Sequence, residues 1–241
     1  MQLFGRSSLA HALTLLITPT NDSDYGYYQS ELAVLMATHA AEILLKSRIA
    51  EEHPLLIFSR IPTSKNRDLL DVEALFETGR TIQYFDIPER LWATTGYKLK
   101  NQNLYLDFGD LRNNVQHFMR SRSKLYLKQK TLEFVFNVVD PFLYDFWGGY
   151  AITCIEHPEY SDEHEDLIRT LFFWDIDFVY PKDYENMVQK AREIAQTWTH
   201  RGNDVLATED QSKEQLEKTW AKYNVKTYPE VWRTKNIDRS H

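Results

Sequence analysis

The sequence predicts an all-α protein, with a four- to five-helix bundle followed by a helical C-terminal extension. The first observation behind this is the composition, because 241 residues that are 43% hydrophobic and 26% charged are typical of a globular protein. The second is that apolar residues recur at helical spacing over most of the chain. The third is that proline or glycine interrupts these stretches where a helix would end.

Two helices are expected at the N-terminus. Residues 7–18 form the first, which Pro19 stops. The second opens at Tyr27 and ends near His53, because Pro54 disfavours the helical state of the residue before it. Spacing of 3.6 residues predicts that the core-facing stripe of this helix consists of Leu32, Leu35, Met36, His39, Ile43 and Ala50.

The middle of the chain predicts further helices. Residues 68–78 are helical in pattern, and Gly79 is a suitable stop. Residues 97–107 alternate only in part, which predicts a short hairpin or an ordered loop. Asp107 is a good N-cap, so the next helix is expected to start at Phe108. Its inward residues are expected to be Leu111, Val115 and Phe118.

The last expected bundle helix covers residues 124–147, with a kink at Pro141 and a break at Gly148 and Gly149. Residues 183–200 and 212–223 predict amphipathic helices beyond it. The expected division is therefore a bundle domain at residues 1–150 and an extension of unknown role at residues 151–241.

Several classes of protein are disfavoured by composition. No run reaches the roughly 18 apolar residues that a membrane span needs. The single cysteine, Cys154, excludes a disulfide framework and a cysteine-rich zinc site. We therefore expect a soluble, cytoplasmic protein that has no membrane partner.

Charge is distributed unevenly along the chain. The formal net charge is -7, yet residues 98–130 hold eight basic and two acidic residues, which gives +6. Residues 131–185 hold thirteen acidic and two basic residues, which gives -11. An acidic protein with one basic segment can still bind an anion locally, because the nearest charges set the field at a surface. A solvated helix face is the alternative interpretation of the same charges.

The strongest candidate for chemistry is the hexapeptide Arg112-Asn-Asn-Val-Gln-His117. On a helix, Asn113 and His117 are four residues apart and share a side, so the amide can orient the imidazole. Arg112 lies about 140° away, but its long side chain can bend towards the same phosphate. Arginine can stabilise a phosphorane-like transition state, and histidine can move a proton to or from a ribose oxygen.

These residues resemble the HEPN superfamily (higher eukaryotes and prokaryotes nucleotide-binding). The resemblance rests on His39-Ala-Ala-Glu-Ile-Leu-Leu-Lys46, followed some 70 residues later by Leu111-Arg-Asn-Asn-Val-Gln-His-Phe118. The family signature is an Arg, usually a polar residue next, and a His after four to six intervening positions. The same spacing occurs at Arg6 with His11 and at Arg48 with His53, but only Arg112 precedes Asn, lies late in the bundle and opens the basic segment.

The resemblance implies a metal-independent endoribonuclease that cleaves RNA through the ribose 2′-hydroxyl without a cofactor. It implies Arg112 and His117 as catalytic residues, Asn113 as their polar neighbour and Glu42 as a supporting acid. Family members are commonly homodimers and act in toxin–antitoxin or antiviral phage-defence systems, so an antitoxin or a regulatory protein is a further expected partner. The basic residues expected to guide the RNA backbone are Arg120, Arg122, Lys124 and Lys128.

Two alternatives stay open. In the first, Arg112 is a solvated partner of Asp110 or Glu42, and the chain is a non-catalytic helical module that binds RNA, a nucleotide or a partner protein. In the second, His39 and Glu42 belong to a carboxylate-bridged metal site, but the further Glu-x-x-His pairs that such bundles need are missing from the sequence, and we expect no metal.

Overall fold

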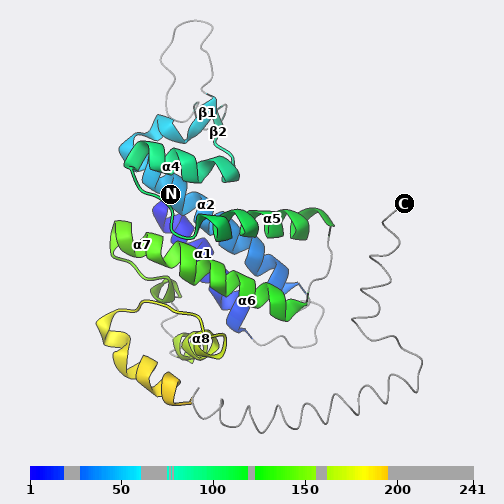
Figure 1. The fold of residues 1–241 in the computed structure, drawn as a ribbon, viewed down its shortest axis with the longest axis vertical. Helices are drawn as coiled ribbons and strands as arrows, with labels where there is room; N and C mark the ends of the chain where they lie inside the picture. Colours follow the sequence, from blue (N-terminus) through cyan, green and yellow to red (C-terminus); the bar gives the residue numbers. More distant parts are fainter. Residues whose placement is uncertain are drawn as a thin grey trace, which may run out of the picture. The chain divides into compact units, whose positions relative to one another are not determined.

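The computed structural model describes residues 1–18, 28–60, 79–118, 123–155 and 162–194, together with Leu75 and Glu77. The chain divides into two compact units, Met1–Ala191 and Arg192–His241. The first unit is mostly helical, which confirms the all-α prediction (Figure 1). Its longer helices are α1 (Gln2–Ile17), α2 (Gln29–Glu52), α4 (Ile87–Thr95), α5 (Gln102–Phe118), α6 (Lys124–Phe134), α7 (Asp140–Trp147) and α8 (Asp162–Phe173).

Short elements connect these helices. Single 3-10 turns form η2 (Pro54–Ile57), η3 (Tyr84–Asp86), η5 (Ala151–Cys154) and η6 (Lys182–Tyr184), whereas η4 (Val135–Val139) is a π-helical segment. The strands β1 (Phe58–Arg60) and β2 (Arg80–Thr81) pair antiparallel, with Phe58 opposite Thr81. Residues 185–194 are helical, within the predicted span 183–200. The predicted helix at 212–223 lies outside the described residues, and of the predicted helix at 68–78 only Leu75 and Glu77 are described, both as helical.

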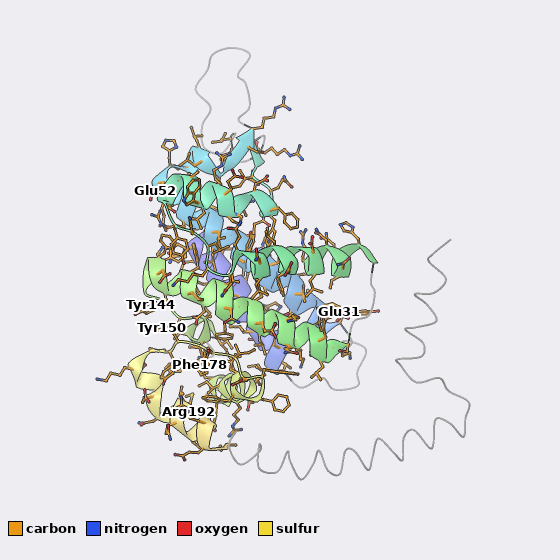
Figure 2. All side chains as sticks on the ribbon, in the orientation of Figure 1. Glu31, Glu52, Tyr144, Tyr150, Phe178 and Arg192 are labelled. Carbon is orange, nitrogen blue, oxygen red and sulfur yellow. The ribbon has the colours of Figure 1, made fainter. Side chains whose placement is uncertain are left out.

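Helix α2 is the centre of the bundle and packs against α1, α4, α5 and α6. In Figure 2 its two ends are marked by the labelled Glu31 and Glu52. Its predicted length is confirmed, but its predicted core face is wrong, because Leu32 and His39 are exposed. Its fully buried apolar side chains are Ala33, Val34, Ala37, Ala40, Ala41, Leu44, Leu45 and Ile49, and half of them are alanines.

Small side chains decide which face of α2 turns inward. A Cβ atom at Gly5 of α1 would lie 2.7 Å from Leu44 Cγ, so only glycine lets α1 approach α2 this closely. Close packing of two helix backbones favours small residues such as the four buried alanines at the contact, and Val34, Leu45 and Ile49 are buried as well.

Helix α5 begins six residues before the predicted start at Phe108, so neither a hairpin nor a loop covers residues 102–107. Asn101 precedes the helix with a left-handed backbone (φ 53°), and its Nδ2 donates a hydrogen bond to the carbonyl oxygen of Asn137 (2.9 Å). Tyr105 is buried together with Phe108, so the apolar face that the sequence shows from Phe108 onward already starts one turn earlier.

Residues 124–147 form the continuous helical run that was predicted, and its irregularity lies just before Pro141. Proline has no N–H and its ring clashes with the carbonyl four residues earlier, so a wider π turn at η4 accommodates it. Pro141 has no N–H to donate to the carbonyl of Asn137, and this carbonyl accepts the hydrogen bond from Asn101 instead.

Residues 151–191 belong to the same compact unit as the preceding helices. Their buried side chains join one hydrophobic cluster with α1 and α7, and they include Ala151, Ile152, Leu167, Ile168 and Leu171. Figure 2 shows Tyr144 at the end of α7 beside Tyr150, and their ring centroids are 5.5 Å apart. Asp140, only 1% exposed, accepts hydrogen bonds from the backbone N–H groups of Ala151 (2.6 Å) and Val179 (3.4 Å).

Candidate functional site

The Arg–His motif lies on the last turns of α5. Burial along the helix reaches Leu111, and none of the residues 112–117 is buried. Arg112 and Asn113 are half-buried, whereas His117 is exposed in the last turn. The candidate catalytic residues therefore lie on the part of α5 that the core does not cover.

Asn113 contacts Arg112 and not His117. Arg112 Nη1 donates a hydrogen bond to Asn113 Oδ1 over 3.0 Å. The exposed imidazole of His117 makes no hydrogen bond or ion pair with any residue in the described ranges. The expected role of Asn113 as the group that orients the imidazole is thus absent from this geometry, and the amide steadies the guanidinium instead.

Glu42 is bound to a lysine of its own helix. Lys46 Nζ lies 2.5 Å from Glu42 Oε1 and 3.2 Å from Thr81 Oγ1 of β2. The side chain of Lys46 is only 8% exposed, so its ammonium group is largely shielded from water. Its positive charge balances the negative charge of the Glu42 carboxylate. Arg112 forms no ion pair with Glu42, Asp110 or any other carboxylate of the described residues.

A stacked tyrosine pair joins η3 to α5. The rings of Tyr84 and Tyr105 are 4.2 Å apart and nearly parallel. Each hydroxyl donates to the other residue's backbone carbonyl, Tyr84 over 3.1 Å and Tyr105 over 3.0 Å. Burial raises the pKa of both hydroxyls well above the usual range, the negative Glu42 raises it further in both, and the positive Arg112 opposes the rise at Tyr84. Glu42 and Arg112 therefore act on the same buried hydroxyl from two helices.

Gly109 makes this arrangement possible. A Cβ atom at this position would lie 2.5 Å from Tyr84 Cε1 and 2.9 Å from Phe85 Cε1. Sequence reasoning missed Tyr84, Tyr105 and Lys46. The available signal was Gly109 itself, since a glycine inside a helical pattern often marks a close approach by another element.

Two of the four basic residues expected to contact RNA, Arg120 and Arg122, lie outside the described residues. Lys124 and Lys128 are one turn apart on α6. Partial burial lowers the pKa of Lys128, and the neighbouring positive charge of Lys124 lowers it further. Within the described ranges Lys128 has no carboxylate partner, whereas the adjacent Lys130 is paired with Glu133.

Two surface pockets lie elsewhere. One of about 580 Å³ is lined by side chains at the start of α5 and in η4, namely Asn101, Gln102, Asn103, Leu104 and Asn137. The second, of about 440 Å³, is lined by Ser59, Ile82, Asp86, Glu89, Arg90, Ala93 and Thr94. Neither of these two pockets is lined by Arg112 or His117.

The described residues were also compared with the requirements of a metal site and of a membrane-spanning helix. Within them, no group of three or more His, Cys, Asp or Glu side chains is arranged to hold a metal ion. His39 is exposed against Phe4, with ring centroids 5.7 Å apart, and does not share a site with Glu42. Nor does any helix among these residues combine the length and apolar character that a membrane crossing requires.

Comparisons with protein-family models, with curated proteins and with solved structures give no match for this chain. The resemblance to the HEPN superfamily therefore rests on the sequence alone, in residues 39–46 and 111–118.

Proposed function

We propose that this protein is a metal-independent endoribonuclease of the HEPN type, acting as a toxin or as a phage-defence effector. The observation that carries the proposal is the uncompensated charge of Arg112. Its guanidinium is half-buried, is held in place by Asn113 and has no carboxylate partner among the described residues. A cation arranged in this way is available to an anionic ligand such as a phosphate.

His117 supplies the proton transfer. Its imidazole takes the proton of the ribose 2′-hydroxyl, and the 2′-oxygen attacks the adjacent phosphorus. Arg112 stabilises the negative charge that develops on the phosphoryl oxygens. The imidazolium then returns the proton to the departing 5′-oxygen. The products are a 2′,3′-cyclic phosphate and a free 5′-hydroxyl, with no metal, oxidant or cofactor consumed.

Geometry on the helix is compatible with both roles. Five residues correspond to a rise of about 7.5 Å and a rotation of about 140°. The two side chains therefore leave α5 on different sides and reach towards a phosphate lying across the last turn. The Lys124–Lys128 pair of α6 provides cations for the neighbouring phosphates.

The test is cleavage of a mixed RNA pool by the purified protein in the presence of EDTA. We expect His117→Ala to lower the rate about 100- to 10,000-fold, the usual contribution of a general acid–base. Its melting temperature is expected to stay unchanged, because His117 is exposed and unbonded in the described structure. Gln116→Ala, at the exposed neighbouring position, is the matched control and should cleave normally. Equal cleavage by His117→Ala and the parent protein would refute the assignment.

A second candidate is a non-catalytic module of the same family type that binds RNA, a nucleotide or a partner protein. The observation that favours it is that Asn113 Oδ1 is used by Arg112, which leaves the imidazole without an orienting partner in the described residues. This candidate predicts RNA binding that depends on Arg112, with no cleavage by either the parent protein or His117→Ala.

A further inference from the structure

Phe85 of η3 is an exposed aromatic residue. Its side chain is 43% exposed, whereas the neighbouring Tyr84 is buried. A single exposed apolar residue needs no explanation, because such residues are common on protein surfaces. What distinguishes Phe85 is the place at which its ring is held.

Gly109 lets the ring of Phe85 lie against α5. Phe85 Cε1 is 2.9 Å from the position that a Cβ atom would take at Gly109. Tyr84 contacts the same ring edge-to-face, with the ring centroids 5.4 Å apart and an interplanar angle of 85°. Contacts with α5 and with Tyr84 hold the ring in position, so little side-chain freedom is left to lose when a ligand binds.

The same geometry brings the ring close to Arg112 and Asn113. On an α-helix these two residues lie about 60° to one side and about 40° to the other side of position 109, roughly one turn further along. Cβ atoms three or four positions apart on a helix are separated by about 5–6 Å. Phe85 Cε1 consequently lies within about 9 Å of the Cβ atoms of both Arg112 and Asn113.

Arg112 supplies a positive charge beside this ring. Its guanidinium donates a hydrogen bond to Asn113 Oδ1 and forms no ion pair with a carboxylate of the described residues. Helix α6 packs against α5 and carries Lys128, which also lacks a carboxylate partner in the part of the chain that the structure describes. Cations that no carboxylate neutralises attract the phosphates of a nucleic acid.

An aromatic ring beside a guanidinium suits a nucleotide whose base is unpaired. Proteins hold single strands by stacking bases on aromatic side chains while basic residues follow the backbone. A base inside a duplex is already stacked between its neighbours, so a protein ring reaches the bases of loops, bulges and single strands. The separation of the ring and the guanidinium is of the order of that between the base and the phosphate of one nucleotide.

We infer that the ring of Phe85 stacks on an unpaired base next to the phosphate that Arg112 binds, and that the protein thereby selects single-stranded RNA. The inference rests on the proposed function in one respect, namely that RNA is the ligand of Arg112. It does not depend on cleavage, so binding alone tests it.

The test compares two short ribose-phosphate strands, one without any base and one with a single adenine. The full-length His117→Ala protein is used throughout, with EDTA present, so that the strands stay intact. Affinity is measured by competition with a labelled single-stranded RNA. We expect the adenine to raise the affinity about ten-fold, which is within the range for stacking one base on an aromatic ring. Adding Phe85→Leu should abolish this preference, and adding Phe85→Tyr, which keeps a ring, should retain it.

Phe173→Leu is the matched control. Phe173 is 63% exposed and has an edge-to-face partner in Trp174, as Phe85 has in Tyr84. It lies on α8, which packs against α1 and η5, so this variant should keep the full preference for the adenine strand. Because both strands are compared on the same variant, a partial loss of folded protein does not alter the ratio of affinities.

Equal affinity of the His117→Ala protein for the two strands would overturn the inference and leave RNA binding through Arg112 standing. So would a preference for the adenine strand that persists in Phe85→Leu. Failure to bind any of the three nucleic acids would instead refute RNA as the ligand, and with it both the proposed function and the stacking role of Phe85.

Discussion

Gly109 is the residue at which η3 comes closest to α5. The ring of Tyr84 occupies the space of a side chain at this position. We predict that Gly109→Ala lowers the free energy of unfolding by about 1–2 kcal/mol, because overpacking costs about 1–3 kcal/mol and the helix propensity of alanine returns at most about 1 kcal/mol. Urea denaturation measures the difference.

The control for this substitution is Asp107→Ala, at an exposed position of the same helix. It gains helix propensity, though less than a glycine gains, without a clash and should leave stability equal or slightly higher. A stabilised Gly109→Ala protein would contradict the close approach of Tyr84.

For individual residues, the sequence allowed part of the candidate site to be predicted. Arg112, Asn113 and His117 lie within six residues of one helix, so their proximity follows from helical geometry. The hydrogen bond from Arg112 to Asn113 could not be predicted in this way, because different rotamers of Arg112 would reach different partners. Contacts such as Lys46 with Thr81 join residues 35 positions apart and depend on the tertiary packing.

Among the elements, α2 shows why the length of a helix is easier to predict than its orientation. Tyr27 and Pro54 bracket the observed Gln29–Glu52 closely, because local backbone chemistry sets helix ends. The orientation depends on which face a neighbour can approach. Alanine counts as only weakly apolar when hydrophobic periodicity is scored, yet it allows the closest helix packing. The predicted stripe that includes Leu32 and His39 was therefore wrongly placed in the core.

Helix α5 was predicted to start too late for a related reason. Asp107 has the chemistry of an N-cap, but the same residue is tolerated on an exposed helix face, where it is found. The start at Gln102 follows Asn101, whose side chain is tied to the carbonyl of Asn137 in η4. That contact spans 36 residues and leaves no local pattern.

Helix α6 offers a test of the RNA-binding surface. We predict that Lys128→Gln weakens the binding of a short single-stranded RNA and reduces the slope of log affinity against log salt by about 0.7, the value for one lost phosphate contact on a single strand. The reason is that Lys128 has no carboxylate partner within the described ranges. Fluorescence anisotropy at several salt concentrations measures both quantities.

Lys130→Gln is the matched control, because Lys130 is already paired with Glu133 on the same helix. Its effect on the salt slope should be smaller than that of Lys128→Gln. Identical slopes for the parent protein and Lys128→Gln would remove Lys128 from the proposed RNA path.

For the whole molecule, Asp140 links the stability of the first unit to pH. Burial raises the pKa of its carboxyl from 3.8 to about 6, against the opposing effect of the amides of Ala151 and Val179. The folded protein therefore holds this proton more tightly than the unfolded chain does. The contribution of Asp140 is greatest below pH 4 and declines as pH rises to about 6, by about 3 kcal/mol for a shift of about two units.

We predict that Asp140→Asn removes this decline. Between about pH 4 and pH 6, the parent protein should lose more unfolding free energy than the variant, whatever the other groups contribute. Urea denaturation at several pH values in this range checks the difference. Parallel stability profiles would show that the carboxyl titrates alike in the folded and unfolded states.

The cross-bonded pair of Tyr84 and Tyr105 also has an optical consequence. Tyrosinate absorbs at longer wavelength than tyrosine, and among the nine tyrosines whose side chains the structure describes only Tyr84 and Tyr105 are buried. Since burial holds both hydroxyls protonated in alkali that ionises an ordinary tyrosine of pKa about 10, the pair ionises only when η3 separates from α5. In a Tyr97→Phe background, which removes another tyrosine of raised pKa, a rapid alkaline jump can therefore time the separation of η3 from α5 without any added label.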